Sequence, residues 1–152
     1  MPKLSFETPV GALTVTEEEG KITALNWGSV RSGEETPLLR QARDQLDAYL
    51  KGARRDFDLP LAPKGTAFQK AVWKSMRKIP YGKTQSYGEI AKKLKSGPRA
   101  VGGASARNPI PIIIPCHRVL GAHGGLGGYS ARGGVKTKRR LLALEGASVA
   151  PR

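Results

Sequence analysis

The sequence predicts an α/β N-terminal domain, a small β-sheet with one helix, followed by a mainly α C-terminal domain that contains a helix-turn-helix. The first sixty residues combine short alternating runs with one amphipathic stretch, whereas the rest reads as short, capped helices. The two parts also differ in charge: residues 1–60 hold 8 Lys/Arg and 10 Asp/Glu, and residues 61–152 hold 18 and 2. We therefore expect domains at residues 1–62 and 63–152.

Strands are predicted on both sides of the N-terminal helix. Residues 13–16 and 22–25 alternate apolar and polar side chains, and Glu19-Gly20 between them suits a tight turn. A further short strand is expected at 56–59, and residues 60–65 are expected to be the linker to the second domain.

One helix is predicted in the N-terminal domain. Thr36 and Pro37 suit the N-cap and the first helical position, and Gly52 suits the end. Its apolar stripe, which we expect to pack on the sheet, comprises Leu38, Leu39, Ala42, Leu46, Tyr49 and Leu50.

The C-terminal domain opens with three predicted helices. Thr66 can cap the first, whose buried face carries Phe68, Val72, Trp73 and Met76. Ser86 and Glu89 have the spacing of a capping box, which places the second helix at about residues 87–95. The third is expected at 98–106. Two short helices joined by a tight, glycine-containing turn indicate a helix-turn-helix.

After Asn108 the chain changes character. Prolines surround residues 112–114, which we expect to form a buried extended run that Pro115 stops. A glycine-rich loop covers residues 121–134, and a last helix is predicted over 136–145.

The net charge of +14 is concentrated in the second domain. A domain so poor in carboxylates creates a positive field that favours polyanions, chiefly nucleic acid, although solubility or a membrane-surface patch are alternatives. No apolar run is long enough to span a bilayer, and the first residues lack a signal-peptide core. We therefore expect a soluble, cytoplasmic protein.

Cys116 is the one cysteine in the chain, which excludes an internal disulfide and a multi-cysteine zinc site. A lone thiol is either a small buried hydrophobe or a nucleophile, and a nucleophile needs a base that a third group orients. His117 is the candidate base, acting directly or through a water. Of the two acidic residues after residue 60, Glu89 already serves the capping box, so Glu145 is the candidate third group. The other histidine, His123, is expected to be a solvated loop residue.

Residues 111–119, Pro-Ile-Ile-Ile-Pro-Cys-His-Arg-Val, resemble the signature of the O6-alkylguanine-DNA alkyltransferases, also called methylated-DNA–protein-cysteine methyltransferases. The resemblance is close over about residues 65–146. Over residues 1–60 it concerns the general plan, for which the family implies a ribonuclease H-like fold. Further similar blocks are Gly65-Thr66-Ala67-Phe68-Gln69, Ile79-Pro80-Tyr81-Gly82, Ser86-Tyr87-Gly88, Arg99-Ala100-Val101-Gly102-Gly103-Ala104 and Gly128-Tyr129-Ser130.

The resemblance implies DNA repair by direct damage reversal. An alkyl group passes from guanine O6 to the cysteine after the nucleotide is flipped out of the duplex, and O4-alkylthymine stays open as a second substrate. Each molecule reacts once, because the thioether product is not hydrolysed. The implied partner is double-stranded DNA carrying O6-alkylguanine, bound by a monomer, with no membrane, metal or organic cofactor. The N-terminal zinc site of some eukaryotic relatives is not expected, because no cysteine or histidine precedes Cys116.

The resemblance also implies roles for individual residues. The implied catalytic set is Cys116, His117, Glu145, Tyr87 and Asn108, in which Tyr87 hydrogen-bonds the departing base and Asn108 ties the recognition helix to the active site. The implied substrate-binding set is Tyr87, Val119, Tyr129, Ser130 and Lys138. The implied DNA-binding set is Arg99, which fills the gap left by the flipped nucleotide, with Ala100, Gly102, Gly103, Ser105 and Arg107.

The sequence leaves two alternative functions. One is a non-catalytic lesion-binding protein of the alkyltransferase-like kind, which keeps the fold but replaces the cysteine. The other is a cysteine hydrolase, for which the basic domain and the helix-turn-helix would have no purpose. The presence of Cys116 favours the alkyl acceptor over the first.

Overall fold

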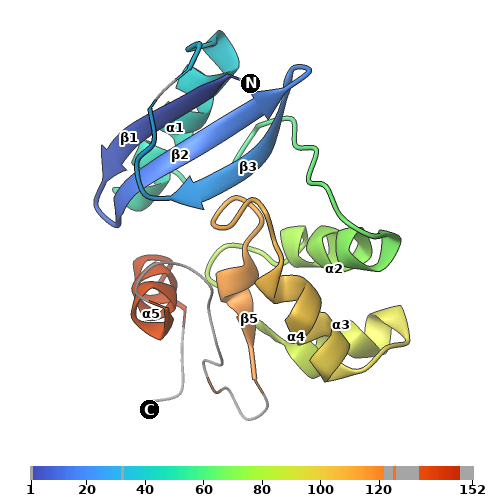
Figure 1. The fold of residues 1–152 in the computed structure, drawn as a ribbon. Helices are drawn as coiled ribbons and strands as arrows, with labels where there is room; N and C mark the ends of the chain where they lie inside the picture. Colours follow the sequence, from blue (N-terminus) through green and yellow to red (C-terminus); the bar gives the residue numbers. More distant parts are fainter. Residues whose placement is uncertain (1, 32, 122–124, 126–133, 148–152) are drawn as a thin grey trace. The chain divides into compact units, whose positions relative to one another are not determined.

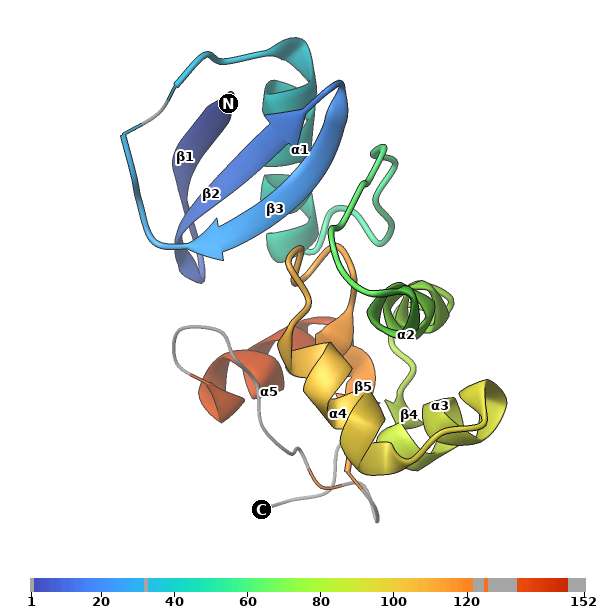
Figure 2. The same cartoon turned by 45° about the vertical axis from the view of Figure 1, so that its right-hand side comes forward.

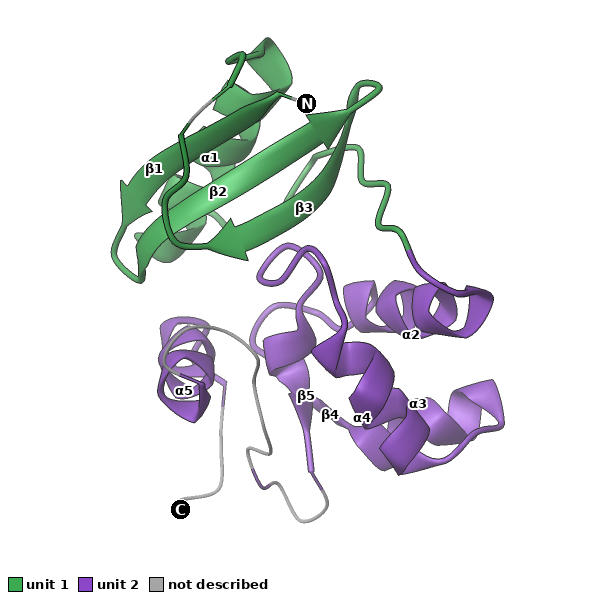
Figure 3. Ribbon diagram, in the orientation of Figure 1, with its two compact units in different colours: residues 1–64 green, residues 65–152 purple. Residues whose placement is uncertain are grey.

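The computed structural model describes residues 2–31, 33–121, 125 and 134–147. The chain forms two compact units, residues 1–64 and residues 65–152 (Figure 3). Among the described residues, no helix combines the length and the apolar character that crossing a membrane requires.

Unit 1 is built on a three-stranded antiparallel sheet in the order β1 (Lys3–Thr8), β2 (Gly11–Glu18), β3 (Lys21–Trp27) (Figure 1). Glu19 and Gly20 form the predicted turn with φ of 51° and 78°, as a two-residue hairpin loop requires. The sequence prediction missed β1. Its alternation is limited to Leu4 and Phe6, and its pairing with Val15 and Leu13 of β2 makes it a strand.

The strand predicted at residues 56–59 is absent, and the chain joins the sheet later. Leu61 makes an isolated parallel bridge to Ile22, whose N–H donates to the Pro60 carbonyl at 2.8 Å. The physical reason is the side chain of Gln45, which accepts from the Asp58 N–H at 2.9 Å and donates to its carbonyl at 3.1 Å. The backbone groups of this segment are thus satisfied by a helix side chain instead of a neighbouring strand.

Helix α1 (Pro37–Leu50) covers the sheet through contacts with β1 and β2 (Figure 2). The predicted cap is confirmed, because the Thr36 hydroxyl accepts from the Leu39 N–H at 3.1 Å. The helix buries Leu39, Ala42, Gln45, Leu46, Tyr49 and Leu50, whereas Leu38 from the predicted stripe is half-buried. Truncating a fully buried leucine such as Leu46 to alanine costs about 2–5 kcal/mol, so this packing holds unit 1 together.

Unit 2 is mainly helical, with α2 (Ala67–Arg77), α3 (Tyr87–Leu94), α4 (Pro98–Ala106) and α5 (Val135–Leu144). Both predicted caps are confirmed: Thr66 caps α2, and Ser86 with Glu89 forms the capping box of α3. Helices α3 and α4 pack together across a short turn in which Lys95 is left-handed, with φ of 56°. The buried Trp73 ties α2 to α4, because its indole N–H donates to the Ala104 carbonyl at 2.9 Å.

Residues 112–114 do not form the predicted extended run. Ile112 has φ of 72°, and Pro111 bridges to Ile114, so the segment is a tight turn. The side chain of Asn108 closes it by donating to the Ile114 carbonyl at 2.9 Å and accepting from the Ile110 N–H at 2.9 Å. The surrounding prolines exclude helix but do not choose between strand and turn. A β-branched residue with positive φ is strained, and here full burial holds it in place.

The turn leads into the 3-10 helix η1 (Cys116–Arg118) and strand β5 (Val119–Leu120). Strand β5 pairs in parallel with β4 (Gln85–Ser86), with Ser86 opposite Leu120. This pairing brings the start of α3 to the segment that carries the cysteine.

Candidate active site

The candidate nucleophile lies at the start of η1. Cys116 is 4% exposed, and its N–H donates to the Ile114 carbonyl at 2.7 Å. His117 follows it in the same turn and is fully buried. The tight turn before η1 thus presents cysteine and histidine together inside unit 2.

Glu145 lies just after the last residue of α5 and reaches the histidine. Its Oε2 is 2.8 Å from His117 Nε2, and both side chains are buried. The Gly82 N–H donates to its Oε1 at 3.2 Å. The structure therefore brings together His117 and Glu145, which are 28 positions apart in the sequence.

Burial lowers the pKa of His117 below its usual 6.5, and the nearby charges of Arg118 and Lys138 act in the same direction. The hydrogen bond and negative charge of Glu145 oppose this shift. His117 is therefore neutral near neutral pH, which is the form that can accept a proton.

Lys138 of α5 is fully buried, and its Nζ donates to the Val119 carbonyl at 2.7 Å. Burial lowers the pKa of Lys138 to about 8, opposed by the charge of Cys116. The ammonium lies 5.7 Å from the centre of the Tyr87 ring. Because the charges of Lys138 and Cys116 interact, the ammonium favours the thiolate form of the cysteine, which is the reactive one.

Tyr87, the first residue of α3, is half-buried. Burial raises the pKa of Tyr87, the charge of Cys116 raises it further, and a hydrogen bond with Ser105 opposes both. The phenol stays protonated near neutral pH and is available as a hydrogen-bond donor.

Ser105 differs from its expected role as a DNA contact. Its side chain is on the buried face of α4, 6% exposed, where it hydrogen-bonds to Tyr87. The reason is helical geometry: Val101, Ala104 and Ser105 form the inward face that packs on α2 and α3. Ser105 is thus placed to orient Tyr87.

The outward face of α4 carries the other expected DNA contacts. Arg99, Ala100, Gly103 and Arg107 are exposed, and Gly102 is half-buried. A Cβ atom added at Gly102 or Gly103 would meet nothing within 4 Å, so no packing inside the protein requires glycine there. Glycine inside a helix costs about 0.5–1 kcal/mol relative to alanine. The two glycines therefore leave this face of α4 without side chains and lower the stability of the helix.

Arg118 is the site residue that the sequence reasoning did not assign. Its guanidinium is directed to Glu145, with Nε 2.8 Å from Oε1 and Nη2 2.9 Å from Oε2. A usable signal was present in the sequence, because a buried carboxylate needs a cation and Arg118 directly follows the candidate base.

Three residues that the sequence analysis discussed, His123, Tyr129 and Ser130, lie outside the described residues.

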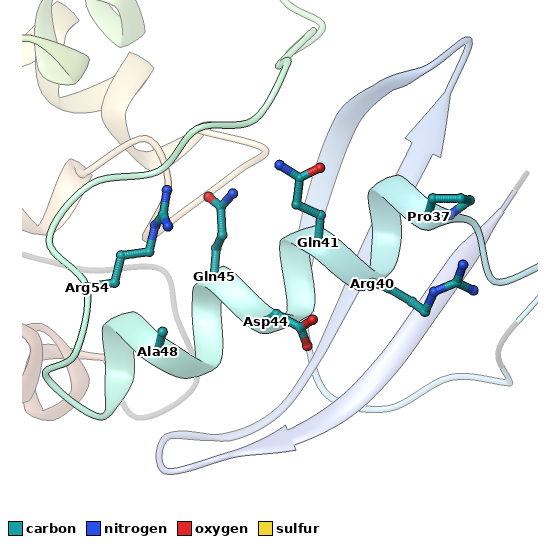
Figure 4. Close-up of a pocket in the computed structure, with 7 residues that line it drawn as sticks. All are labelled: Pro37, Arg40, Gln41, Asp44, Gln45, Ala48 and Arg54. Carbon is teal, nitrogen blue, oxygen red and sulfur yellow. The ribbon is translucent and has the colours of Figure 1, made fainter.

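Unit 1 carries a separate pocket of about 480 Å³ beside α1, lined by Pro37, Arg40, Gln41, Asp44, Gln45, Ala48 and Arg54 (Figure 4). Gln41 and Gln45 both donate to the Asp58 carbonyl, at 3.3 and 3.1 Å, so these amides serve the fold. The lining contains no nucleophile with an adjacent base. In the described part of the chain, no group of three or more histidine, cysteine or acidic residues could hold a metal ion.

Two family profiles match the chain. One, described as 6-O-methylguanine DNA methyltransferase, ribonuclease-like domain, matches residues 3–63. The other, described as 6-O-methylguanine DNA methyltransferase, DNA binding domain, matches residues 67–147. Together they cover both units.

Curated relatives match over nearly the full length. The methylated-DNA–protein-cysteine methyltransferase of Methanosarcina acetivorans is 44% identical, over 93% of this chain and 96% of its own length. The constitutive methylated-DNA–protein-cysteine methyltransferase of Bacillus subtilis is also 44% identical, over 91% of this chain and 90% of its own.

Solved structures show the same fold. The crystal structure of Mycobacterium tuberculosis OGT in complex with DNA superposes with a TM-score of 0.84 at 43% identity, over 95% of this chain and 92% of that one. S. pombe Atl1, solved with damaged DNA containing O6-carboxymethylguanine, is more distant, with a TM-score of 0.50 at 28% identity over 59% of this chain and 84% of that one.

Proposed function

The chain belongs to the 6-O-methylguanine DNA methyltransferase family, and we propose that it repairs DNA by moving the alkyl group of an O6-alkylguanine onto Cys116. The observation that carries the proposal is the placement of the chain's one cysteine. Cys116 directly precedes a buried, neutral histidine that is hydrogen-bonded to a buried glutamate. The chain thus supplies a nucleophile, a base next to it in the sequence and a group that orients the base, which are the parts needed to activate a thiol.

The proposed reaction begins with transfer of the Cys116 proton to His117, directly or through a water. The thiolate attacks the alkyl carbon, the S–C bond forms, and the C–O6 bond breaks with its electron pair left on the guanine. Tyr87 donates a hydrogen bond that stabilises the negative charge on the departing base. The positive charge of Lys138 supports the thiolate before the attack.

The reaction is stoichiometric. A thioether has no electrophilic carbonyl that water could attack, so Cys116 stays alkylated and the molecule is consumed.

DNA binding is assigned to the outward face of α4 in residues 63–152. A base inside a duplex cannot present O6 to a thiolate, so the nucleotide has to be flipped out at a cost of a few kcal/mol. We propose that Arg99 fills the gap, while Gly102 and Gly103 allow close approach to the duplex. Ala100 and Arg107, exposed on the same helix or at its end, complete the contact surface.

The remaining substrate contacts are assigned by resemblance to the family. The Val119 carbonyl and the residues Tyr129 and Ser130 would hold the flipped base, with Asn108 linking α4 to the turn before Cys116. The protein would act as a monomer on double-stranded DNA in the cytoplasm.

The test is mass spectrometry after exposure to a duplex that contains O6-methylguanine. We expect a mass increase of one methyl group per protein molecule, located on the peptide that contains Cys116. Cys116→Ala should bind the same duplex and gain no mass, and methylation of this variant would refute Cys116 as the acceptor. Tight binding by the unmodified chain without any mass change would favour the lesion-binding alternative, and continuous turnover would favour a hydrolase.

A further inference from the structure

Arg118 is an unusual arginine, because it is buried and yet is neither the nucleophile, Cys116, nor the base, His117. Its side chain is 8% exposed, and each of its three nitrogens donates to an acceptor inside unit 2. Nε and Nη2 donate to the two oxygens of Glu145, and Nη1 donates to the Ile79 carbonyl at 2.7 Å. The guanidinium also lies 5.8 Å from the centre of the Tyr81 ring.

The two-pronged contact with Arg118 determines the charge of Glu145. A bidentate guanidinium–carboxylate pair favours the ionised carboxylate, because the opposite charges attract and both oxygens are then acceptors only. The Gly82 N–H adds a further donor to Oε1. Without its cation, a carboxyl group buried this deeply would tend to take up a proton.

The charge of Glu145 in turn determines which nitrogen of His117 carries the proton. An ionised carboxylate can only accept, so the 2.8 Å contact between Oε2 and Nε2 requires a proton on Nε2. In the neutral imidazole the lone pair is then on Nδ1, and Nδ1 is the atom that can receive the proton of Cys116. A protonated Glu145 could instead donate to Nε2, which would place the imidazole proton on Nδ1 and remove the base.

We propose that Arg118 is a positioning residue that keeps the proton of His117 on Nε2 by holding Glu145 in its ionised form. The inference rests on the proposed function, because it assigns His117 the part of the base. It goes beyond that function by making the protonation of the pair depend on a residue that does not touch the cysteine. The charged groups around His117 are Glu145, Arg118 and Lys138, and of these Arg118 alone forms a two-pronged contact with Glu145.

The first test reads the tautomer without any reaction. In protein labelled with ¹⁵N-histidine, long-range ¹H–¹⁵N spectra distinguish a protonated Nε2 from a protonated Nδ1. We expect the wild-type protein to carry the proton on Nε2, and Arg118→Met to show a substantial share on Nδ1 at neutral pH. A wild-type spectrum with the proton on Nδ1 would overturn the inference.

The second test is the pH profile of single-turnover transfer from free O6-benzylguanine, which avoids DNA binding. Arg118→Met should lose on the order of 10²-fold in rate at neutral pH, the scale of general-base catalysis, and regain part of it as the pH rises and Glu145 ionises. Arg118→Lys keeps the charge without the two-pronged geometry, so a smaller loss with the same alkaline displacement is expected. The matched control is Arg140→Met, an exposed arginine of α5, which should leave rate and profile unchanged.

The outcomes separate this inference from the proposed function. If wild-type protein shows the expected tautomer but no alkylation of Cys116, the proposed function fails and the tautomer assignment stands. If Arg118→Lys, verified as folded by circular dichroism, keeps the wild-type pH profile, the inference fails even where Arg118→Met does not fold.

Discussion

At the scale of single residues, the site works by keeping charges inside the protein. Glu145 is 6% exposed, Lys138 and His117 are fully buried, and each depends on partners rather than on water. Burial of a titratable group changes its pKa, and a changed pKa makes folding depend on pH. The same arrangement that activates the thiol therefore affects stability.

His117 provides a test of this dependence. Its pKa in the folded protein is below the usual 6.5, so the unfolded chain binds a proton more readily. The contribution of neutral His117 to stability is thus complete above pH 6.5 and is lost as the pH falls toward the folded value. We expect the free energy of unfolding in urea to fall between pH 7.5 and pH 5.5, more steeply than in a folded His117→Gln variant. Parallel pH dependences in the two proteins would contradict the burial effect.

The sequence was sufficient for part of the site and insufficient for the rest. Cys116 and His117 belong to one motif, and Glu145 remained once Glu89 was assigned to a capping box. Those choices needed only local patterns and the scarcity of acidic residues. The contact of Arg118 with Glu145 depends on the packing of α5 against η1, so the sequence could offer Arg118 as a nearby cation but could not show that it reaches Glu145.

At the scale of elements, the caps were predictable and the irregular segments were not. Thr36, Thr66 and Ser86 cap their helices through bonds within three residues, which sequence spacing reports directly. The segments at 56–59 and 112–114 are instead shaped by side-chain amides, those of Gln45 and Asn108, which bind backbone groups at 2.9–3.1 Å and so replace regular pairing.

Helix α4 yields a prediction about its two glycines. Gly102→Ala and Gly103→Ala should each raise the free energy of unfolding by about 0.5–1 kcal/mol, because alanine is the better helix former and nothing in the protein is within 4 Å of the added atom. The same changes should weaken binding to duplex DNA, because a methyl group now stands on the contact face. Thermal unfolding and fluorescence anisotropy with a labelled duplex measure the two effects. Gly88→Ala adds the same methyl group to α3, where the nearest atom, Ser86 Oγ, is 3.7 Å away, and so controls for the helix-propensity effect outside α4. Stabilised variants with unchanged DNA affinity would remove α4 from the interface.

At the scale of the whole molecule, charge is divided between the units. Residues 1–60 are nearly balanced, with 8 Lys/Arg and 10 Asp/Glu, and residues 61–152 are strongly basic, with 18 and 2. The two acidic residues of the basic part, Glu89 and Glu145, serve a helix cap and a buried ion pair. Almost all of the positive charge of unit 2 thus remains available to a polyanion.

This division predicts how salt affects DNA binding. The logarithm of the binding constant should fall linearly with the logarithm of salt concentration, with a slope of about −0.9 for each phosphate contacted. Arg107→Ala should reduce the salt slope by about 1. Lys51→Ala is the control, because this exposed residue of unit 1 is paired with Asp47 at 2.9 Å.

Arg99→Ala should lower the rate of repair in duplex DNA, while free O6-benzylguanine still reacts. Equal losses on duplex and free base for Arg99→Ala would speak against a role in nucleotide flipping.

The shielding of Cys116 has a practical consequence. The chain carries one sulfhydryl, and 4% of that residue's surface reaches solvent. A bulky maleimide therefore has little access to Cys116 in this conformation, and we expect its coupling rate to be limited by local opening of the site. Because the chain has no second thiol, the rate of maleimide coupling reports on Cys116 alone. Measured with and without DNA, this rate would show whether DNA changes how often the active site opens.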